Sequence, residues 1–282
     1  MRSLERVDKR LTNGLALGVI WLAAITTVAA LGAILLYVVV NGIGSLTPAF
    51  IFTWPHGVNM EGGIWPTIQS TVYVTALAML ITTPVAVLAA VYLAEYAVQG
   101  RLVRTIRFAA DSLASVPSIV MGLFGLAAFV EGAGLKFSVL AAALALSFLL
   151  LPIVMRTTEE AIRSVPRYAR WGSYGLGATK WQTVSRIVLP SATPRITTGV
   201  ILAAGRAAGE TAVVIYTMGT MINAPLFPSD GGRTMPVHLM LLAQDGINLH
   251  AAYGTALVLV LMVLAFNIVA RWVSRRNRSM QG

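Results

Sequence analysis

The sequence predicts an all-α integral membrane protein with six transmembrane helices. Of its 282 residues, 57% are hydrophobic and only 11% are charged, whereas soluble domains average about 25% charged residues. Six stretches are apolar over the roughly 20 residues that a helix needs to cross a bilayer. They lie near residues 15–40, 68–94, 108–130, 137–156, 195–222 and 251–271. The chain has no cysteine, which excludes a disulfide scaffold and thiol chemistry.

The basic residues predict the orientation of these spans. Eighteen of the 21 lysines and arginines fall on one side of a six-span arrangement: at the two ends of the chain, in the turn 101–107 and in the segment 156–195. Lys136 and Arg233 fall on the other side. Basic loops stay cytoplasmic, so both termini are predicted to face the cytoplasm. The net charge of +10 therefore indicates topology and contact with anionic lipid, not nucleic-acid binding.

The first span follows a short cytoplasmic N-terminus, residues 1–14. It runs for about 25 apolar residues without a small-residue cleavage pattern at its end, so we expect it to be retained. Residues 15–282 then form one transmembrane domain with two exterior segments, 41–67 and 223–250. All three histidines lie in these exterior segments, and neither segment has the spacing of a catalytic or metal site.

The second and third spans carry polar residues. Glu95 closes the second span, and we expect it to be solvated or paired with a loop. Arg107 and Asp111 are four residues apart, so they share a helix face and are expected to pair. Ser115 and Ser118 lie on either side of a proline in the third span. Because proline inside a span frees a backbone carbonyl, a kink that lines a transport pathway is expected here, and these serines are candidates for lining it.

The cytoplasmic segment 157–194 is divided by local start and stop signals. The helix of the fourth span is expected to continue to about Ser164. Pro166 suits the first turn of a second helix that ends at the glycines after it. Thr179, with a glutamine three residues later, has the pattern of a capping box that starts a third helix. Pro190 is expected to end that helix.

This cytoplasmic segment forms a shelf that carries four large aromatic residues, Tyr168, Trp171, Tyr174 and Trp181. Aromatic side chains among arginines are typical of a surface that docks a protein partner. An amphipathic element lying against lipid has the same composition. The residues alone leave both interpretations open.

The run GLGATKWQTVSRIVLPSATP in the shelf resembles the EAA loop of ATP-binding-cassette (ABC) importer permeases. That signature is a glycine followed, after nine residues, by Ile-x-Leu-Pro. In the family the loop forms a coupling helix seated in a groove of the ATPase subunit. The resemblance implies a coupling surface made by Tyr168, Trp171, Tyr174, Gly177, Ala178, Ile187, Leu189 and Pro190. The chain departs from the family at Trp171-Gly172-Ser173, where Glu-Ala-Ala is usual.

Four further stretches are similar, in the same order, to PstA-type permeases of phosphate-specific importers. They are GGIWPTIQST (62–71), YLAEYA (92–97), VPSIVMGLFG (116–125) and GRAAGETA (205–212). The resemblance implies a type I ABC importer permease fold in the plasma (inner) membrane of a bacterium or archaeon. It implies three kinds of partner: two ATPase subunits, a second related permease chain, and an extracytoplasmic phosphate-binding protein.

The chain has no ATP site of its own in its sequence. A phosphate-cradling loop needs the pattern G-x-x-x-x-G-K-[ST], and the nearest candidate, residues 172–179, lacks the lysine. We therefore expect a non-catalytic subunit that binds no cofactor and no metal, with ATP and Mg held by the partner ATPase.

Other functions are possible from the residues. A permease for sulfate, molybdate or phosphonate keeps the class and changes the cargo. A stand-alone channel or secondary transporter would leave the aromatic shelf without a use, and the two halves of the chain show no inverted pair of broken helices. An intramembrane hydrolase would need a Ser/His or two-carboxylate set, which the spans lack.

The run GRAAGETAVV places Arg206 and Glu210 inside the fifth span. Arg206 follows Pro194 by 12 residues, about 18 Å along a helix, near the middle of a hydrocarbon core roughly 30 Å thick. A lone charge there costs on the order of 3 kcal/mol. The two residues are predicted to form either an internal salt bridge that fixes helix packing or a cationic contact for an oxyanion in passage. Thr211 is the adjacent pathway candidate.

Overall fold

The computed structural model describes residues 2–57, 60–244 and 246–279, which are mostly helical. The helices are α1 (Arg2–Gly42), α2 (Pro48–Phe52), α3 (Trp65–Val91), α4 (Arg101–Ala114), α5 (Ser118–Gly125), α6 (Val139–Arg163), α7 (Arg167–Gly175), α8 (Lys180–Thr183), α9 (Leu189–Ala208), α10 (Ala212–Thr217), α11 (Met235–Gln244) and α12 (Leu249–Ser279). Tighter or wider helical turns adjoin them: η1 (Ile43–Ser45), η2 (Tyr92–Tyr96), η3 (Leu126–Gly132) and η4 (Val184–Val188). Two short strands, β1 (Pro55–His56) and β2 (Glu61–Gly62), pair antiparallel.

The membrane spans agree with the hydropathy of the sequence. Within the described ranges, five helical runs are long and apolar enough to cross a bilayer: Ala16–Ser45, Trp65–Tyr96, Val139–Arg163, Lys180–Ala208 and Leu249–Trp272. A bent helix pair, Arg101–Ala114 with Ser118–Gly132, supplies the sixth. The predicted all-α, six-span architecture is therefore confirmed.

The third span, predicted over residues 108–130 with a kink at its proline, is sharply bent. Its two halves, α4 and α5 with η3, meet at 98°. The bend falls at Val116-Pro117, where Pro117 adopts extended backbone with ψ 139°. Proline has no N–H to donate and disfavours a helical conformation in the residue before it, so the helix cannot continue through this dipeptide.

The fifth span is also broken, although it was predicted as one helix over 195–222. α9 ends at Ala208, Gly209 caps it, and helical structure resumes only at Ala212. Glycine is the poorest helix former after proline. The chain therefore leaves the helix between Arg206 and Glu210.

Pro190 does not end the third cytoplasmic helix, contrary to the prediction. α8, η4 and α9 form one continuous run from Lys180 to Ala208. The π-helical turn η4 lies directly before the proline. Such a turn loosens the regular hydrogen-bond ladder close to the position where Pro190 has no N–H to donate.

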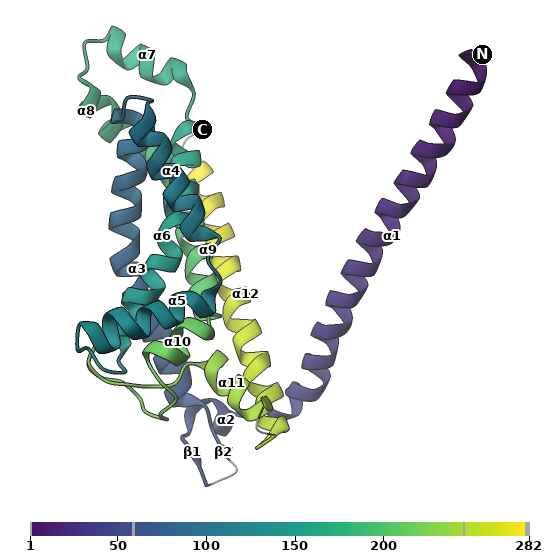
Figure 1. Ribbon diagram of the computed structural model, residues 1–282, viewed down its shortest axis with the longest axis vertical. Helices are drawn as coiled ribbons and strands as arrows, with labels where there is room; N and C mark the ends of the chain where they lie inside the picture. The colour runs from purple at the N-terminus through teal and green to yellow at the C-terminus, as the bar shows by residue number, and fades with distance from the viewer. Residues whose placement is uncertain (1, 58–59, 245, 280–282) are drawn as a thin grey trace.

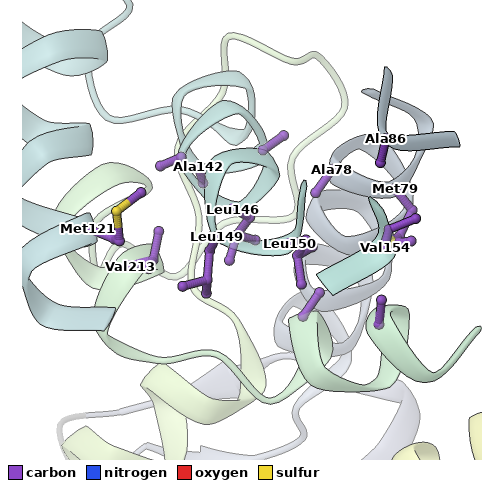
Figure 2. Packing of buried hydrophobic residues seen from close by; sticks show 14 of the residues in the cluster. Ala78, Met79, Ala86, Met121, Ala142, Leu146, Leu149, Leu150, Val154 and Val213 are labelled. Atoms are coloured by element: carbon purple, nitrogen blue, oxygen red, sulfur yellow. The ribbon is translucent and has the colours of Figure 1, made fainter. Parts of the chain in front are cut away.

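The core lies around α6, which packs between α3 on one side and α5 and α10 on the other (Figure 2). Leu146 and Leu150 on α6 are fully buried, and Ala78 on α3 and Ala142 on α6 are buried without exposed surface. Small residues let helices approach closely, which is how helices associate in a bilayer where lipid is as apolar as leucine.

α1 stands apart from the other helices and meets them only near its C-terminal end (Figure 1). None of its most apolar stretch is buried. At the junction, the ring of Tyr37 lies edge-on to that of Tyr253, with centroids 5.6 Å apart, and Gly42 lies against the Tyr253 backbone. α1 begins and α12 ends at the end of the molecule where α7 lies.

The two segments predicted to face the exterior are folded, not open loops. Residues 41–67 contain η1, α2 and the β-hairpin, and Trp54 and Trp65 remain exposed there. Residues 223–250 contain the short apolar helix α11, which packs on α12 and α3. Both segments lie at the end of the molecule opposite α7 (Figure 1).

Candidate functional site

The break between α9 and α10 determines the arrangement of the charged motif. Arg206 lies in the last turn of α9 with an exposed side chain, while Glu210 and Thr211 lie in the break and are half-buried. Within the residues that the structure describes, no ion pair joins Arg206 to Glu210 or to any other carboxylate. The predicted internal salt bridge is therefore wrong, because the helix that would align the two side chains ends between them.

Arg206 is nevertheless placed where the backbone favours a cation. The C-terminal end of a helix carries a partial negative charge from its unpaired carbonyl groups. Arg206 is the basic residue of that last turn. An exposed guanidinium held there keeps its donors available for a ligand.

The two helix breaks lie next to each other. α5 begins after the Pro117 break and packs on α10, which begins after the Gly209 break (Figure 1). Their contact is close at Gly122, where an added Cβ would lie 2.6 Å from the carbonyl oxygen of Ala212. Ser118 precedes Gly122 by one helical turn, and Thr211 directly precedes Ala212. The structure thus brings Ser118 and Thr211 into the same region.

Ser115 lies on the α4 side of the bend. Its side chain is exposed, and its hydroxyl donates to the carbonyl oxygen of Ser112 at 2.7 Å. This hydrogen bond satisfies a carbonyl in the last turn of α4. Ser115 therefore has a local structural role, besides any contribution to a pathway.

The eight predicted coupling residues of the shelf differ in their exposure. Tyr168, Trp171, Tyr174 and Gly177 are exposed, and the Trp171 side chain is 67% exposed. Ala178, Ile187 and Leu189 are half-buried, and Pro190 is exposed on the stem that leads into α9. The aromatic residues thus form an outward surface on a stem that packs against the membrane helices.

Local signals shape the shelf as predicted. α7 starts after Pro166 and ends at Gly175, and Gly177 has φ +82°, a left-handed conformation that favours glycine. The capping box is present: Thr179 Oγ1 accepts from the Gln182 N–H, and Gln182 Oε1 accepts from the Thr179 N–H.

Ion pairs join α4 to α6. Arg107 does not pair with Asp111 as expected; its Nη2 donates to Glu159 Oε1 at 2.8 Å, and Arg163 donates to the same oxygen at 2.6 Å. Asp111 instead accepts from Arg156 at 3.2 Å. The break in the third span moves α4 alongside α6, so the partners come from different helices.

Two buried polar residues in the segment 223–250 were not recognised from the sequence. The His238 side chain on α11 is only 1% exposed, and Arg233 Nη1 lies 3.3 Å from its Nδ1. Arg233 Nε donates to the Thr220 carbonyl oxygen at 2.6 Å. Burial, and secondly the Arg233 charge, lower the His238 pKa to about 4. The sequence did carry a signal for this site, because Arg233 is one of two basic residues predicted to lie on the exterior side.

Among the described residues, no three His, Cys, Asp or Glu side chains cluster in a way that could hold an ion. The candidate site combines the exposed Arg206, the half-buried hydroxyl residues Ser118 and Thr211, and the exposed aromatic residues of the shelf. Such groups can bind an anion and a protein partner.

Comparison with known proteins agrees with this arrangement. Residues 82–279 match the family model of the binding-protein-dependent transport system inner membrane component. The chain belongs to this family. The permease is 36% identical to the probable ABC transporter permease protein YqgI of Bacillus subtilis, over 95% of this chain and 96% of that protein. It is 35% identical to the phosphate transport system permease protein PstA 1 of Mycobacterium tuberculosis, over 80% and 78%. The predicted resemblance to PstA-type permeases is confirmed.

Solved structures share the fold of this permease. A chain of a bacterial alginate ABC transporter, in complex with an alginate pentasaccharide-bound periplasmic protein, matches with a TM-score of 0.68 at 16% identity, over 93% of this chain and 94% of that one. A chain of the inward-facing MetNI methionine ABC transporter matches with a TM-score of 0.62 at 20% identity, over 76% and 94%. The predicted ABC importer permease fold is thus confirmed.

Proposed function

We propose that this permease moves inorganic phosphate across the plasma membrane in an ATP-driven importer. The observation that carries the proposal is Arg206: an exposed guanidinium in a membrane span, at a helix break, with no ion pair among the described residues. A planar guanidinium suits a tetrahedral oxyanion, to which it can donate two parallel hydrogen bonds. PstA permeases among the relatives support phosphate as the cargo.

The exposure of Arg206 supports a second permease chain. A charge inside a span is costly unless it faces other protein or a water-filled cavity. Among the described residues, neither the core nor an ion pair covers Arg206, so the face that carries it is completed by another chain. The uncovered apolar surface of α1 is consistent with the same conclusion. The pathway then lies between two related permeases, with Ser118, Glu210 and Thr211 beside it.

The aromatic surface of the shelf supports docking of two ATPase subunits, one on each permease chain. Trp171 takes the place of the usual glutamate, so its contact with the ATPase is apolar where the family's is acidic. ATP and Mg belong to those subunits, and this chain has no catalytic role. The shelf and both termini then lie in the cytoplasm. The exterior segments 41–67 and 223–250 face an extracytoplasmic phosphate-binding protein, which delivers the cargo.

The first test is phosphate uptake by vesicles that hold the reconstituted importer. ATP is supplied on the side of the membrane that carries the ATPase subunits. Arg206→Gln and Glu210→Gln are compared with the parent. Lys136→Gln is the control, because Lys136 is an exposed cation outside the spans and its loss makes the same change in net charge. We expect the Arg206→Gln importer to assemble and to lose most of its phosphate transport. We expect the Glu210→Gln importer to release phosphate from the pathway more slowly.

The outcomes separate the two functions of the motif. Assembly without transport in Arg206→Gln supports passage of the anion past this residue. Loss of assembly in both variants shows that the motif holds the chains together, and the anion path then lies elsewhere. A parent importer that moves sulfate, molybdate or phosphonate and ignores phosphate keeps the permease class and overturns the cargo.

A second test addresses the shelf. Trp171→Ala removes an exposed aromatic side chain, so we expect it to reduce recovery of the ATPase with the permease while the permease stays folded. Trp54→Ala on the exterior side is the matched control, because it removes the same side chain at the opposite end. Equal recovery with both variants would contradict docking at the shelf.

A further inference from the structure

α7 is attached to the membrane helices by very few contacts. Ser173 is its only buried residue, and the Ser173 hydroxyl lies 2.9 Å from that of Thr183 at the end of α8. The exposed residues of α7 include Tyr168, Trp171 and Tyr174. A force applied to this helix must therefore pass through a small number of side chains to reach the spans.

Arg170 makes the most extensive of these contacts. Its Nε and Nη2 donate to Glu95 Oε1 at 3.1 and 2.6 Å. Its Nη1 donates to the carbonyl oxygen of Val165 at 2.7 Å, and Nη2 also donates to that of Ile162 at 3.0 Å. One guanidinium thus holds three acceptors, in a fork that lysine cannot reproduce.

The three acceptors belong to two different spans. Glu95 lies in η2, the π-helical turn that continues α3. Ile162 lies in the last turn of α6, and Val165 follows two residues after the end of that helix at Arg163. α3 and α6 pack along the central core. Arg170 therefore links α7 to the cytoplasmic ends of the two helices that form that core.

The Glu95–Arg170 pair is enclosed, unlike a surface salt bridge. The side chains are 9% and 15% exposed, respectively. A buried pair of this kind often adds little net stability, because both ions lose water, but removing one partner leaves an uncompensated buried charge. A groove of about 640 Å³ lies beside the pair and is lined by residues of α7 and η2. The pair is thus largely enclosed, while Trp171 and Tyr174 of α7 remain exposed.

We propose that Arg170 is the joint that transmits movement of α7 to α3 and α6, so that the spans follow the ATPase. This inference rests on the proposed docking of an ATPase at the shelf. Arg170 is a positioning residue: it touches neither the cargo nor ATP, and it acts by keeping α7 and two spans in one moving unit.

The test uses the assembled importer in vesicles, with ATP hydrolysis and phosphate uptake measured on the same sample. Arg170→Lys keeps the charge and removes the fork, and Glu95→Gln removes the charge of the acceptor. Arg167→Lys is the matched control, because Arg167 is exposed on the same helix and lines the same groove. We expect the Arg170→Lys and Glu95→Gln importers to hydrolyse ATP, and the phosphate moved per ATP to fall about tenfold.

A second measurement follows the movement itself and does not depend on the cargo. The chain has no native cysteine, so spin labels can be placed by Leu88→Cys on α3 and Leu176→Cys beside α7, both of which are exposed. If α3 and α7 move together, the distance between the labels stays constant when ATP binds to the parent complex. We expect it to change on ATP binding when Arg170→Lys is added.

The two measurements distinguish the inference from the function on which it rests. An unchanged ratio of uptake to hydrolysis overturns the joint, including the case in which both fall in proportion because the complex assembles poorly. A label distance that stays constant on ATP binding in Arg170→Lys also overturns it. A parent complex that moves no phosphate, yet shows the expected label distances, overturns the cargo and supports the joint.

Discussion

A methyl group added at Gly122 tests the contact that brings the two helix breaks together. The Cβ of Gly122→Ala would lie 2.6 Å from the Ala212 carbonyl oxygen and 2.9 Å from Cδ2 of Tyr216. Real Cβ atoms essentially never approach another heavy atom closer than 3.0 Å. The carbonyl is backbone and cannot rotate away, so α5 and α10 must separate by about 0.4 Å or more. Overpacking of this kind costs about 1–3 kcal/mol.

Gly205→Ala is the matched control for this change. Gly205 is also a helical glycine, but its added Cβ would meet only Phe266 Cβ at 3.7 Å, an ordinary contact. Both substitutions gain helix propensity of up to about 1 kcal/mol, so the difference between the two variants isolates the clash. Unfolding of the purified permease in mixed micelles with increasing SDS measures that difference. Equal stability of the two variants would show that α5 and α10 are not packed this closely.

Three further changes test other parts of the structure. Because the pKa of His238 is lowered from 6.5 to about 4, the unfolded chain takes up a proton at higher pH than the folded one. The contribution of His238 to stability is therefore complete above pH 6.5 and falls by up to about 3 kcal/mol as the pH drops to 4. His238→Gln should flatten this dependence when unfolding is measured as a function of pH. Glu159→Gln removes a carboxylate that is 10% exposed and is shared by two arginines, so it should lower the free energy of unfolding by about 3 kcal/mol. Glu160→Gln, at a 69% exposed position, should lower it by less than about 1 kcal/mol in the same assay. Thr179→Ala removes the capping box and should cost about 1 kcal/mol, seen as faster hydrogen exchange in α8 with exchange in α12 unchanged.

Much of the fold could be predicted from the sequence, because hydropathy and capping act over short distances. Apolar runs located the spans, and the helix starts at Pro166 and Thr179 followed from the residues next to them. The kink at Pro117 was predicted without its angle, and the break at Gly209 was not predicted. A proline or a glycine can remain inside a helix, as Pro152 does in α6, and packing decides which of them ends it.

The candidate site was predicted in part. Arg206 was chosen because a charge in a span is costly without a function, Thr211 because it adjoins the charged motif, and Ser118 because it adjoins a proline. The structure places Ser118 and Thr211 in one region. The predicted pairing of Arg206 with Glu210 failed because it assumed a continuous helix. Arg233 and His238 were taken as loop residues, since the sequence gives no measure of how deeply a segment between spans is covered.

The sequence by itself determined the class of protein, the number of spans, the predicted sidedness and the positions of the short shelf helices. Each of these depends on interactions within one turn of helix or within one 20-residue window. Only the tertiary structure decided which charges meet: Glu95 with Arg170, Arg107 with Glu159, and Asp111 with Arg156. These partners are separated by 75, 52 and 45 residues, and such contacts exist only after the helices have packed, because the angle at each break sets which helix ends lie together.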